Sequence, residues 1–280
     1  MQTINDRMKH NYEEVSKTRL TRKTPVIIRL DGKAFHTFTK GLKRPYDTIF
    51  HDTMNATMKY LCEHIQGCKL GYTQSDEITL LLTDFDTITT DAWFDYEVQK
   101  MCSISASMAT LAFNKAFREF YEKYAEKDLD SDSETSSEVW EYIKILTDKL
   151  DQAMFDSRCF NIPEDEVVNC FIWRQQDATR NAIQMLGQTY FSPKELHKKK
   201  SNEIQDMLML QKGINFNDMP TEFKRGVCCR KVSAYSPKVP GDKNSGIDFS
   251  TERKKWYVDK DIPIFTQDRD YILRCMTKEI

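Results

Sequence analysis

The pattern of apolar and polar positions in the first 120 residues predicts a strand, a helix, two strands and a second helix. Residues 25–30 form a short apolar run that ends at Asp31 and Gly32, as a buried strand does where it enters a turn. Residues 47–66 contain no Gly or Pro and repeat apolar side chains at near-helical spacing. Two further strands are expected at 67–73 and 78–83, joined by a polar turn, and a helix at 97–121.

The middle of the chain completes a recognisable order of elements. Residues 126–138 are acidic and rich in Ser, which indicates a surface loop. Residues 157–162 predict a fourth strand, so the order becomes β-α-β-β-α-β. We therefore predict an α+β fold with a ferredoxin-like polymerase palm, an antiparallel sheet with helices on one face.

Beyond the palm, the pattern predicts further helices and a short strand. Helices are expected at 164–186 and 194–211, and a strand near 256–258. We predict three parts, since 280 residues can hold one large domain with an appended smaller one. These are a palm-like catalytic domain (1–162), a helical extension packed on the palm (163–232) and a C-terminal tail of unassigned role (233–280).

Composition and charge narrow the class of protein. The formal net charge is -2, but residues 192–238 contain ten Lys or Arg against five Asp or Glu, a segment that could meet phosphates or simply be a solvated face. The eight cysteines show no paired C-x-x-C spacing and are expected to be reduced thiols. No signal peptide or membrane-spanning run is visible, so a cytoplasmic protein without a membrane partner is expected.

Acidic residues at two strand ends are the strongest candidates for chemistry. Asp31 follows the first strand, and Asp76 and Glu77 lie at the tip of the predicted hairpin. In a ferredoxin-like sheet these positions are neighbours, and two carboxylates can hold a pair of Mg²⁺ ions about 3.5 to 4 Å apart for phosphoryl transfer. Gly32 would let a cation or phosphate approach the backbone closely. The alternative is that Asp31 and Asp76 are ordinary solvated turn residues.

The residues after Gly32 favour the functional interpretation. Lys33, Phe35 and His36 place a cation, an aromatic face and an imidazole within one turn of the predicted metal site. A bound triphosphate and its base would need groups of these kinds.

Three ordered motifs, at 29–36, 43–47 and 72–77, resemble those of the tRNA(His) guanylyltransferase family and its guanylyltransferase-like relatives. The resemblance continues through 155–158, 173–177 and 223–226, and covers roughly residues 5 to 231. It implies a nucleotidyltransferase in which Asp31, Asp76 and Glu77 are catalytic and the metal ligands are Asp31, Gly32 and Asp76. It implies nucleotide contacts from Asp31, Gly32, Lys33, Ala34, Phe35, His36, Ser75 and Asp76. Secondary candidates for nucleotide or RNA contacts are Lys43, Arg44, Asp47, Lys100, Arg174 and Asn181.

One departure from the family pattern bears on the substrate. Enzymes specific for tRNA(His) carry a His-Ile-Asn-Asn tetrad after the Trp-Arg-Gln run, whereas this chain has Thr179, Arg180, Asn181 and Ala182. The chain is therefore more similar to the guanylyltransferase-like proteins, which resemble template-dependent 3'-to-5' polymerases that repair tRNA 5' ends. The resemblance implies two Mg²⁺ ions, activation by ATP or GTP, a tRNA substrate and a homotetramer.

Alternatives remain open at this point. The chain could add G at position -1 of tRNA(His), or use the same palm as a nucleotide cyclase or a 5'-to-3' polymerase. A protein of another class, which binds RNA through an inactive palm, is also possible. An independent feature is that Arg174, Asp177, Asn181 and Gln184 share one face of a helix, which could line a groove or be only its wet face.

Overall fold

A six-stranded antiparallel sheet forms the centre of the protein. The computed structural model describes residues 2–129, 137–235 and 252–276. The strand order is β4-β1-β3-β2-β5-β6, and every adjacent pair is antiparallel. The strands are β1 (Val26–Gly32), β2 (Cys68–Gln74), β3 (Glu77–Leu82), β4 (Phe155–Asn161), β5 (Val227–Tyr235) and β6 (Glu252–Asp259).

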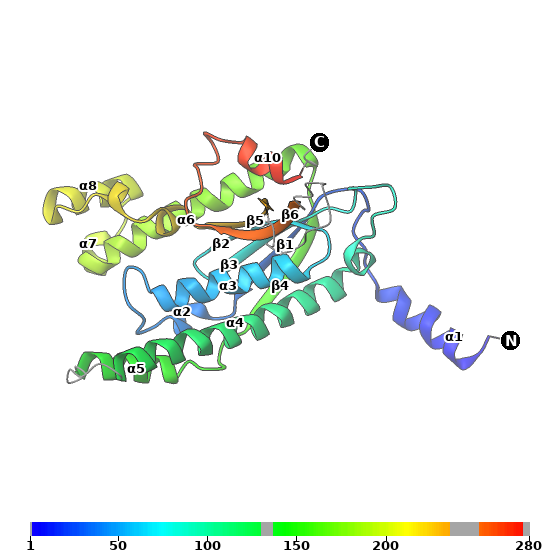
Figure 1. The fold of residues 1–280 in the computed structure, drawn as a ribbon, viewed down its shortest axis with the longest axis horizontal. Helices are drawn as coiled ribbons and strands as arrows, with labels where there is room; N and C mark the ends of the chain where they lie inside the picture. The colour runs from blue at the N-terminus through cyan, green and yellow to red at the C-terminus, as the bar shows by residue number, and fades with distance from the viewer. Residues whose placement is uncertain (1, 130–136, 236–251, 277–280) are drawn as a thin grey trace, which may run out of the picture.

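Two long helices cover one face of the sheet (Figure 1). These are α3 (Thr48–His64) and α4 (Val98–Leu129), which pack on Ile28, Leu30 and Leu80 to form the largest apolar core. Asp47 starts α3, because its Oδ1 accepts a hydrogen bond from Phe50 N at 3.0 Å. The shorter α2 (Phe35–Phe38) and α5 (Ser137–Thr147) lie on this side of the molecule.

The opposite face is covered by α6 (Val167–Tyr190) and α10 (Asp270–Met276). A second core joins them to the sheet through Ile27, Tyr72 and Phe171. Gln175 of α6 fixes the segment before α10, since its amide donates to Pro263 O and its carbonyl accepts from Phe265 N, both at 2.9 Å. The C-terminal segment is therefore part of the packed structure.

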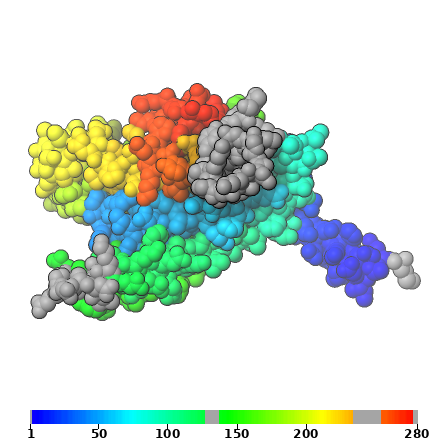
Figure 2. Space-filling model, in the orientation of Figure 1, coloured from blue at the N-terminus to red at the C-terminus, as the bar shows by residue number. Residues whose placement is uncertain are grey.

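A third apolar cluster extends α6 beyond the sheet. It joins Ile183 and Leu186 of α6 to Ile204 and Leu208. Figure 2 shows this lobe at the same end of the molecule as α5, with residues from the start of α3 between them. The elements of the lobe are α7 (Pro193–Leu196), α8 (Ser201–Lys212), η5 (Phe216–Asp218) and α9 (Thr221–Arg225).

The remaining short elements lie outside these layers. At the N-terminus, α1 and the two turns after it point away from the sheet (Figure 1). The full set of remaining short elements is α1 (Ile4–Met8), η1 (Lys9–Glu13), η2 (Glu14–Ser16), η3 (Trp93–Tyr96) and η4 (Glu164–Glu166). Among the described residues, no helix is long and apolar enough to cross a membrane.

The predicted α+β palm and its four strands are confirmed. The expected surface loop at 126–138 is wrong at its start, because α4 continues to Leu129, and residues 130–136 lie outside the described residues. Helix α5, strand β5 and helix α10 were not predicted. The division of the chain at residues 162 and 232 stays a prediction, although β5 and β6 hydrogen bond into the palm sheet.

Candidate active site

Three carboxylates lie in a row across neighbouring strands. Asp31 of β1 is paired with Glu77 of β3 on one side and with Asp156 of β4 on the other. Directly opposite residues project from the same face of a sheet, so all three side chains belong to the face that α6 partly covers. The sequence motifs indicated Asp31 and Glu77. Asp156 lies in the motif at 155–158, but its place beside Asp31 emerges only from the register of β4.

The hairpin turn brings Asp76 to the end of this row. Gly32 N donates a hydrogen bond to Asp76 O at 3.1 Å, which ties the end of β1 to the turn. Burial raises the pKa of the Asp76 carboxyl, and the nearby charge of Asp31 raises it further. A hydrogen bond from the Ser75 hydroxyl at 3.0 Å and the nearby His36 act in the opposite direction.

Asp31 and Asp76 fit a divalent cation. A divalent cation that binds between two neighbouring carboxylates relieves the repulsion between their charges. Within the described ranges, no group of three Asp, Glu, His or Cys side chains forms a ready-made metal cluster. The remaining ligands would therefore come from backbone oxygens, water or the phosphates of a substrate, as is usual for Mg²⁺.

Packing alone requires a glycine at position 32. A Cβ atom at this position would lie 2.3 Å from the Phe35 ring. Phe35 is only 2% exposed and packs against Phe38, Phe113 and Phe155. Its ring is therefore part of the core, and a nucleotide could touch Phe35 only through its backbone.

The other residues after Gly32 lie on the surface. Lys33, Ala34 and His36 are exposed. Ala34 adopts a left-handed conformation (φ 56°, ψ 35°) just before α2, a conformation uncommon for a residue with a side chain. Lys33 N donates to Met154 O at 2.8 Å, so this loop is fixed to the start of β4.

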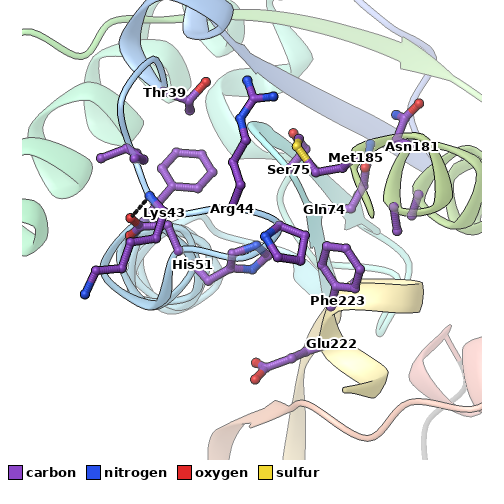
Figure 3. A pocket seen from close by; sticks show the side chains of 17 residues that line it. Thr39, Lys43, Arg44, His51, Gln74, Ser75, Asn181, Met185, Glu222 and Phe223 are labelled. Atoms are coloured by element: carbon purple, nitrogen blue, oxygen red, sulfur yellow. Dashed lines mark hydrogen bonds between the residues drawn. The ribbon is translucent and has the colours of Figure 1, made fainter. Parts of the chain in front are cut away.

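A pocket of about 120 Å³ adjoins the hairpin turn (Figure 3). It brings together five residues that the sequence indicated, from three separate segments. These are Lys43, Arg44, Asp47, Ser75 and Asn181. Asn181 comes from α6, so tertiary packing alone places it beside Ser75. The remaining wall includes Ala178 and Met185 of α6 and Phe223 of α9.

The two cations of the pocket differ in orientation. The Lys43 ammonium lies 4.3 Å from the centre of the Tyr142 ring and 5.1 Å from that of Tyr124. Arg44 instead extends between Thr39 and Ser75 (Figure 3). Arg44 makes no ion pair within the part of the chain that the structure describes.

Asp47 has a structural role in the pocket wall. Its Oδ2 accepts hydrogen bonds from Lys43 N at 2.9 Å and from the Tyr142 hydroxyl at 2.6 Å. Beside it, His51 stacks on Tyr46 with ring centroids 3.9 Å apart. Burial lowers the pKa of His51 to about 4, so this imidazole is neutral at pH 7.

Glu77 and Arg174 form a buried ion pair beside the acidic row. Arg174 Nη1 of α6 donates to Glu77 Oε2 at 2.8 Å, and the side chains are 7% and 10% exposed. The Arg174 guanidinium also lies 3.6 Å from the centre of the Trp173 ring. Both residues were predicted to serve chemistry or RNA contacts. Their geometry gives them a role in holding α6 on the sheet.

Lys100 does not line the pocket beside Ser75. It is near the N-terminus of α4, where its ammonium lies 5.2 Å from the centre of the Phe94 ring. Its assignment to the nucleotide stays a prediction.

Comparisons with known proteins agree with the fold. Residues 5–163 match the family model described as tRNAHis guanylyltransferase. The tRNA(His) guanylyltransferase of Saccharomyces cerevisiae is 28% identical over 219 residues, which is 72% of this chain and 80% of that protein. A bacterial tRNA(His) guanylyltransferase-like protein solved with ATP has a TM-score of 0.76 and 40% identity, covering 98% of this chain and 99% of that one. The GTP complex of such a bacterial protein has a TM-score of 0.73 and 36% identity, with the same coverage.

The palm sheet together with the family match identifies a nucleotidyltransferase. Because the family model matches more than half of the sequence, the chain belongs to the tRNA(His) guanylyltransferase family.

Proposed function

We propose that the protein is a template-dependent 3'-to-5' nucleotidyltransferase that adds nucleotides to the 5' end of tRNA and so repairs that end. The observation that carries the proposal is the position of Asp31 within the acidic row and of Asp76 in the turn next to it, beside a pocket that Arg44 lines. Among the described residues, Arg44 has no ion-pair partner. The family membership and the ATP and GTP complexes of similar bacterial proteins support it.

The reaction joins an incoming nucleotide to an activated RNA end. The 3'-hydroxyl oxygen of the nucleotide forms a bond with the 5' phosphorus of the RNA, and its proton passes to solvent. Pyrophosphate leaves from a 5'-triphosphate end, and AMP leaves from an end activated with ATP. Two Mg²⁺ ions, held by Asp31, Asp76 and the backbone of Gly32, would make the hydroxyl more acidic and neutralise charge on the leaving group.

The chain's own groups position the substrate. Arg44, Lys33 and His36 are exposed around the turn, where they can bind the phosphates of the nucleotide. The pocket beside Ser75 would receive the base, with Asn181 and Gln74 as its polar walls. Lys43, whose ammonium rests on two tyrosine rings, and Lys100 are secondary candidates for phosphate contacts.

The residues that replace the His-Ile-Asn-Asn tetrad support repair over tRNA(His) guanylylation. The Thr179 hydroxyl donates to Lys224 O at 2.9 Å, and Arg180 forms an ion pair with Asp177. Ala182 is buried beside the pocket. Thr179 and Ala182 therefore serve packing, and Arg180 pairs with Asp177 on the surface, whereas Asn181 lines the pocket.

The test is addition of labelled nucleotides to two tRNAs, one lacking its first nucleotide and one a full-length tRNA(His), with and without Mg²⁺. We expect Mg²⁺-dependent addition of the template-matched nucleotide to the truncated tRNA. Asp76→Asn should abolish addition, whereas Asp165→Asn should not, because Asp165 is an exposed carboxylate on η4. Mg²⁺ should also raise the Tm of the wild type and of Asp165→Asn, but not that of Asp76→Asn.

Addition of G to tRNA(His) alone would contradict the repair activity in favour of guanylylation. Turnover by Asp76→Asn at the wild-type rate would contradict the metal-site assignment. We further propose that the protein acts in the cytoplasm as a homotetramer, and size-exclusion chromatography with light scattering tests the oligomeric state.

A further inference from the structure

An exposed tryptophan lies beside the acidic row. Trp173 of α6 is 51% exposed, although a large aromatic ring gains most from burial. The guanidinium groups of Arg174 and Arg29 lie 3.6 Å and 5.4 Å from the centre of its ring. Because Arg174 is buried and bonded to Glu77, the guanidinium beside the ring is fixed in place. The indole is thus held in a defined position while much of it faces solvent.

The surface next to Trp173 is open and mixed in charge. Arg29 comes two residues before Asp31 on β1, so both side chains project from the same face of the sheet. On the edge strand β4, Asp156 lies opposite Asp31, and Arg158 lies opposite Arg29. Their side chains are 57% and 49% exposed and form an ion pair at 2.9 Å. An aromatic ring, two arginines and the acidic row therefore share one accessible part of the sheet.

This surface is separate from the pocket beside Ser75. The pocket is lined by α6 from Ala178 onward, and Asn181 is eight residues after Trp173. At 1.5 Å per helical residue, Trp173 and Asn181 are about 12 Å apart along the axis. A nucleotide in the pocket would leave Trp173 uncovered, with the carboxylates within reach of both places.

We propose that Trp173 is the stacking platform for the terminal nucleotide at the 5' end of the RNA substrate. The proposal rests on the function proposed above, because it assigns the second substrate of the same site. Stacking of a base on an aromatic ring tolerates any base, which suits an enzyme that must accept RNA ends of different sequence. Arg158 and Arg29 supply charge for the phosphates next to the stacked base, and the guanidinium groups beside the ring strengthen its contact with an anionic strand.

The experiment compares KM for RNA with KM for the nucleotide in Trp173→Ala, Trp173→Phe and Trp140→Ala. Trp140 on α5 is 52% exposed and is a matched control for loss of a surface indole. We expect Trp173→Ala to raise KM for RNA about ten-fold or more, since loss of one stacked base has an effect of this order. KM for the nucleotide should be unchanged, Trp173→Phe should retain most of the affinity, and Trp140→Ala should match the wild type.

A second readout does not depend on turnover. Binding of a 5'-monophosphorylated RNA should quench tryptophan fluorescence in the wild type and in Trp140→Ala, and much less in Trp173→Phe. An unchanged KM for RNA in Trp173→Ala would overturn the proposal, as would a lower affinity that accompanies a changed oligomeric mass. If the wild type adds nothing to any RNA, the proposed function fails, whereas the quenching experiment still decides whether Trp173 meets RNA.

Discussion

Replacing Arg174 by Met should destabilise the protein more than replacing Glu77 by Gln, although both changes remove the same ion pair. In Arg174→Met, the buried Glu77 carboxylate keeps the Thr79 hydroxyl at 3.3 Å and Arg29 at 4.0 Å. In Glu77→Gln, Arg174 keeps the Asp177 carboxylate at 3.5 Å, and the new amide has nearly the shape of the lost carboxylate. The asymmetry follows from which charge is left buried without a close partner.

The expected magnitudes differ by about a factor of two. Removal of one partner from a buried ion pair costs about 3 to 5 kcal/mol, and Arg174→Met fits this case. Loss of one hydrogen bond to a charged group costs about 1.5 to 3 kcal/mol, which is the expectation for Glu77→Gln. The double variant Arg174→Met with Glu77→Leu leaves neither charge behind, so it should unfold within about 1 kcal/mol of the wild type.

Urea unfolding in metal-free buffer measures all three variants, with the free energy of unfolding obtained by linear extrapolation. Metal-free buffer matters because Glu77 adjoins the predicted cation site, and a ligand that binds only the folded state would add its own stabilisation. A cost below about 1 kcal/mol for Arg174→Met would refute the reasoning. A double variant as unstable as Arg174→Met would refute it as well, because the stranded carboxylate would then not be the cause.

Two further predictions concern the walls of the pocket. Gly226 has φ +80°, and a Cβ there would lie 2.5 Å from Thr73 O, whereas at Gly213, with φ +67°, a Cβ would meet nothing within 4 Å. Gly226→Ala should therefore lower the urea midpoint clearly more than Gly213→Ala, which carries only the backbone strain of about 1 kcal/mol, and equal effects would contradict the clash. For His51, burial lowers the pKa from 6.5 to about 4, so the folded state binds fewer protons than the unfolded state between these values. This contribution to stability is present above pH 6.5 and is lost as the pH falls toward 4. His51→Phe should therefore lose less stability between pH 7 and pH 5 than the wild type. Parallel losses in the two proteins would contradict the lowered pKa of His51.

Most of the palm could be predicted because its signals are local. The apolar run before Asp31 and the polar turn before Glu77 are readable in the sequence, and the β-α-β-β-α-β order then places them as neighbours. The structure confirms this through the pairing of Asp31 with Glu77. Of the two strands that extend the sheet, β6 was predicted near 256–258, whereas β5 was not. Residues 227–235 contain no turn signal of their own, and they become a strand because β2 offers them an unpaired edge.

The sequence alone determined the class of elements, the position of Asp31 and Asp76, and the family to which the chain belongs. The tertiary structure decided which of the residues indicated by the sequence lie together. Asn181 and Ser75 line the same pocket, whereas the Phe35 ring packs in the apolar core. It also added Asp156 to the acidic row and fixed Trp173 beside it. The physical reason is that hydrophobic periodicity encodes only which face of a helix or strand is buried. The register of the edge strand β4 and the packing of α6 depend instead on contacts between residues about a hundred positions apart in the sequence.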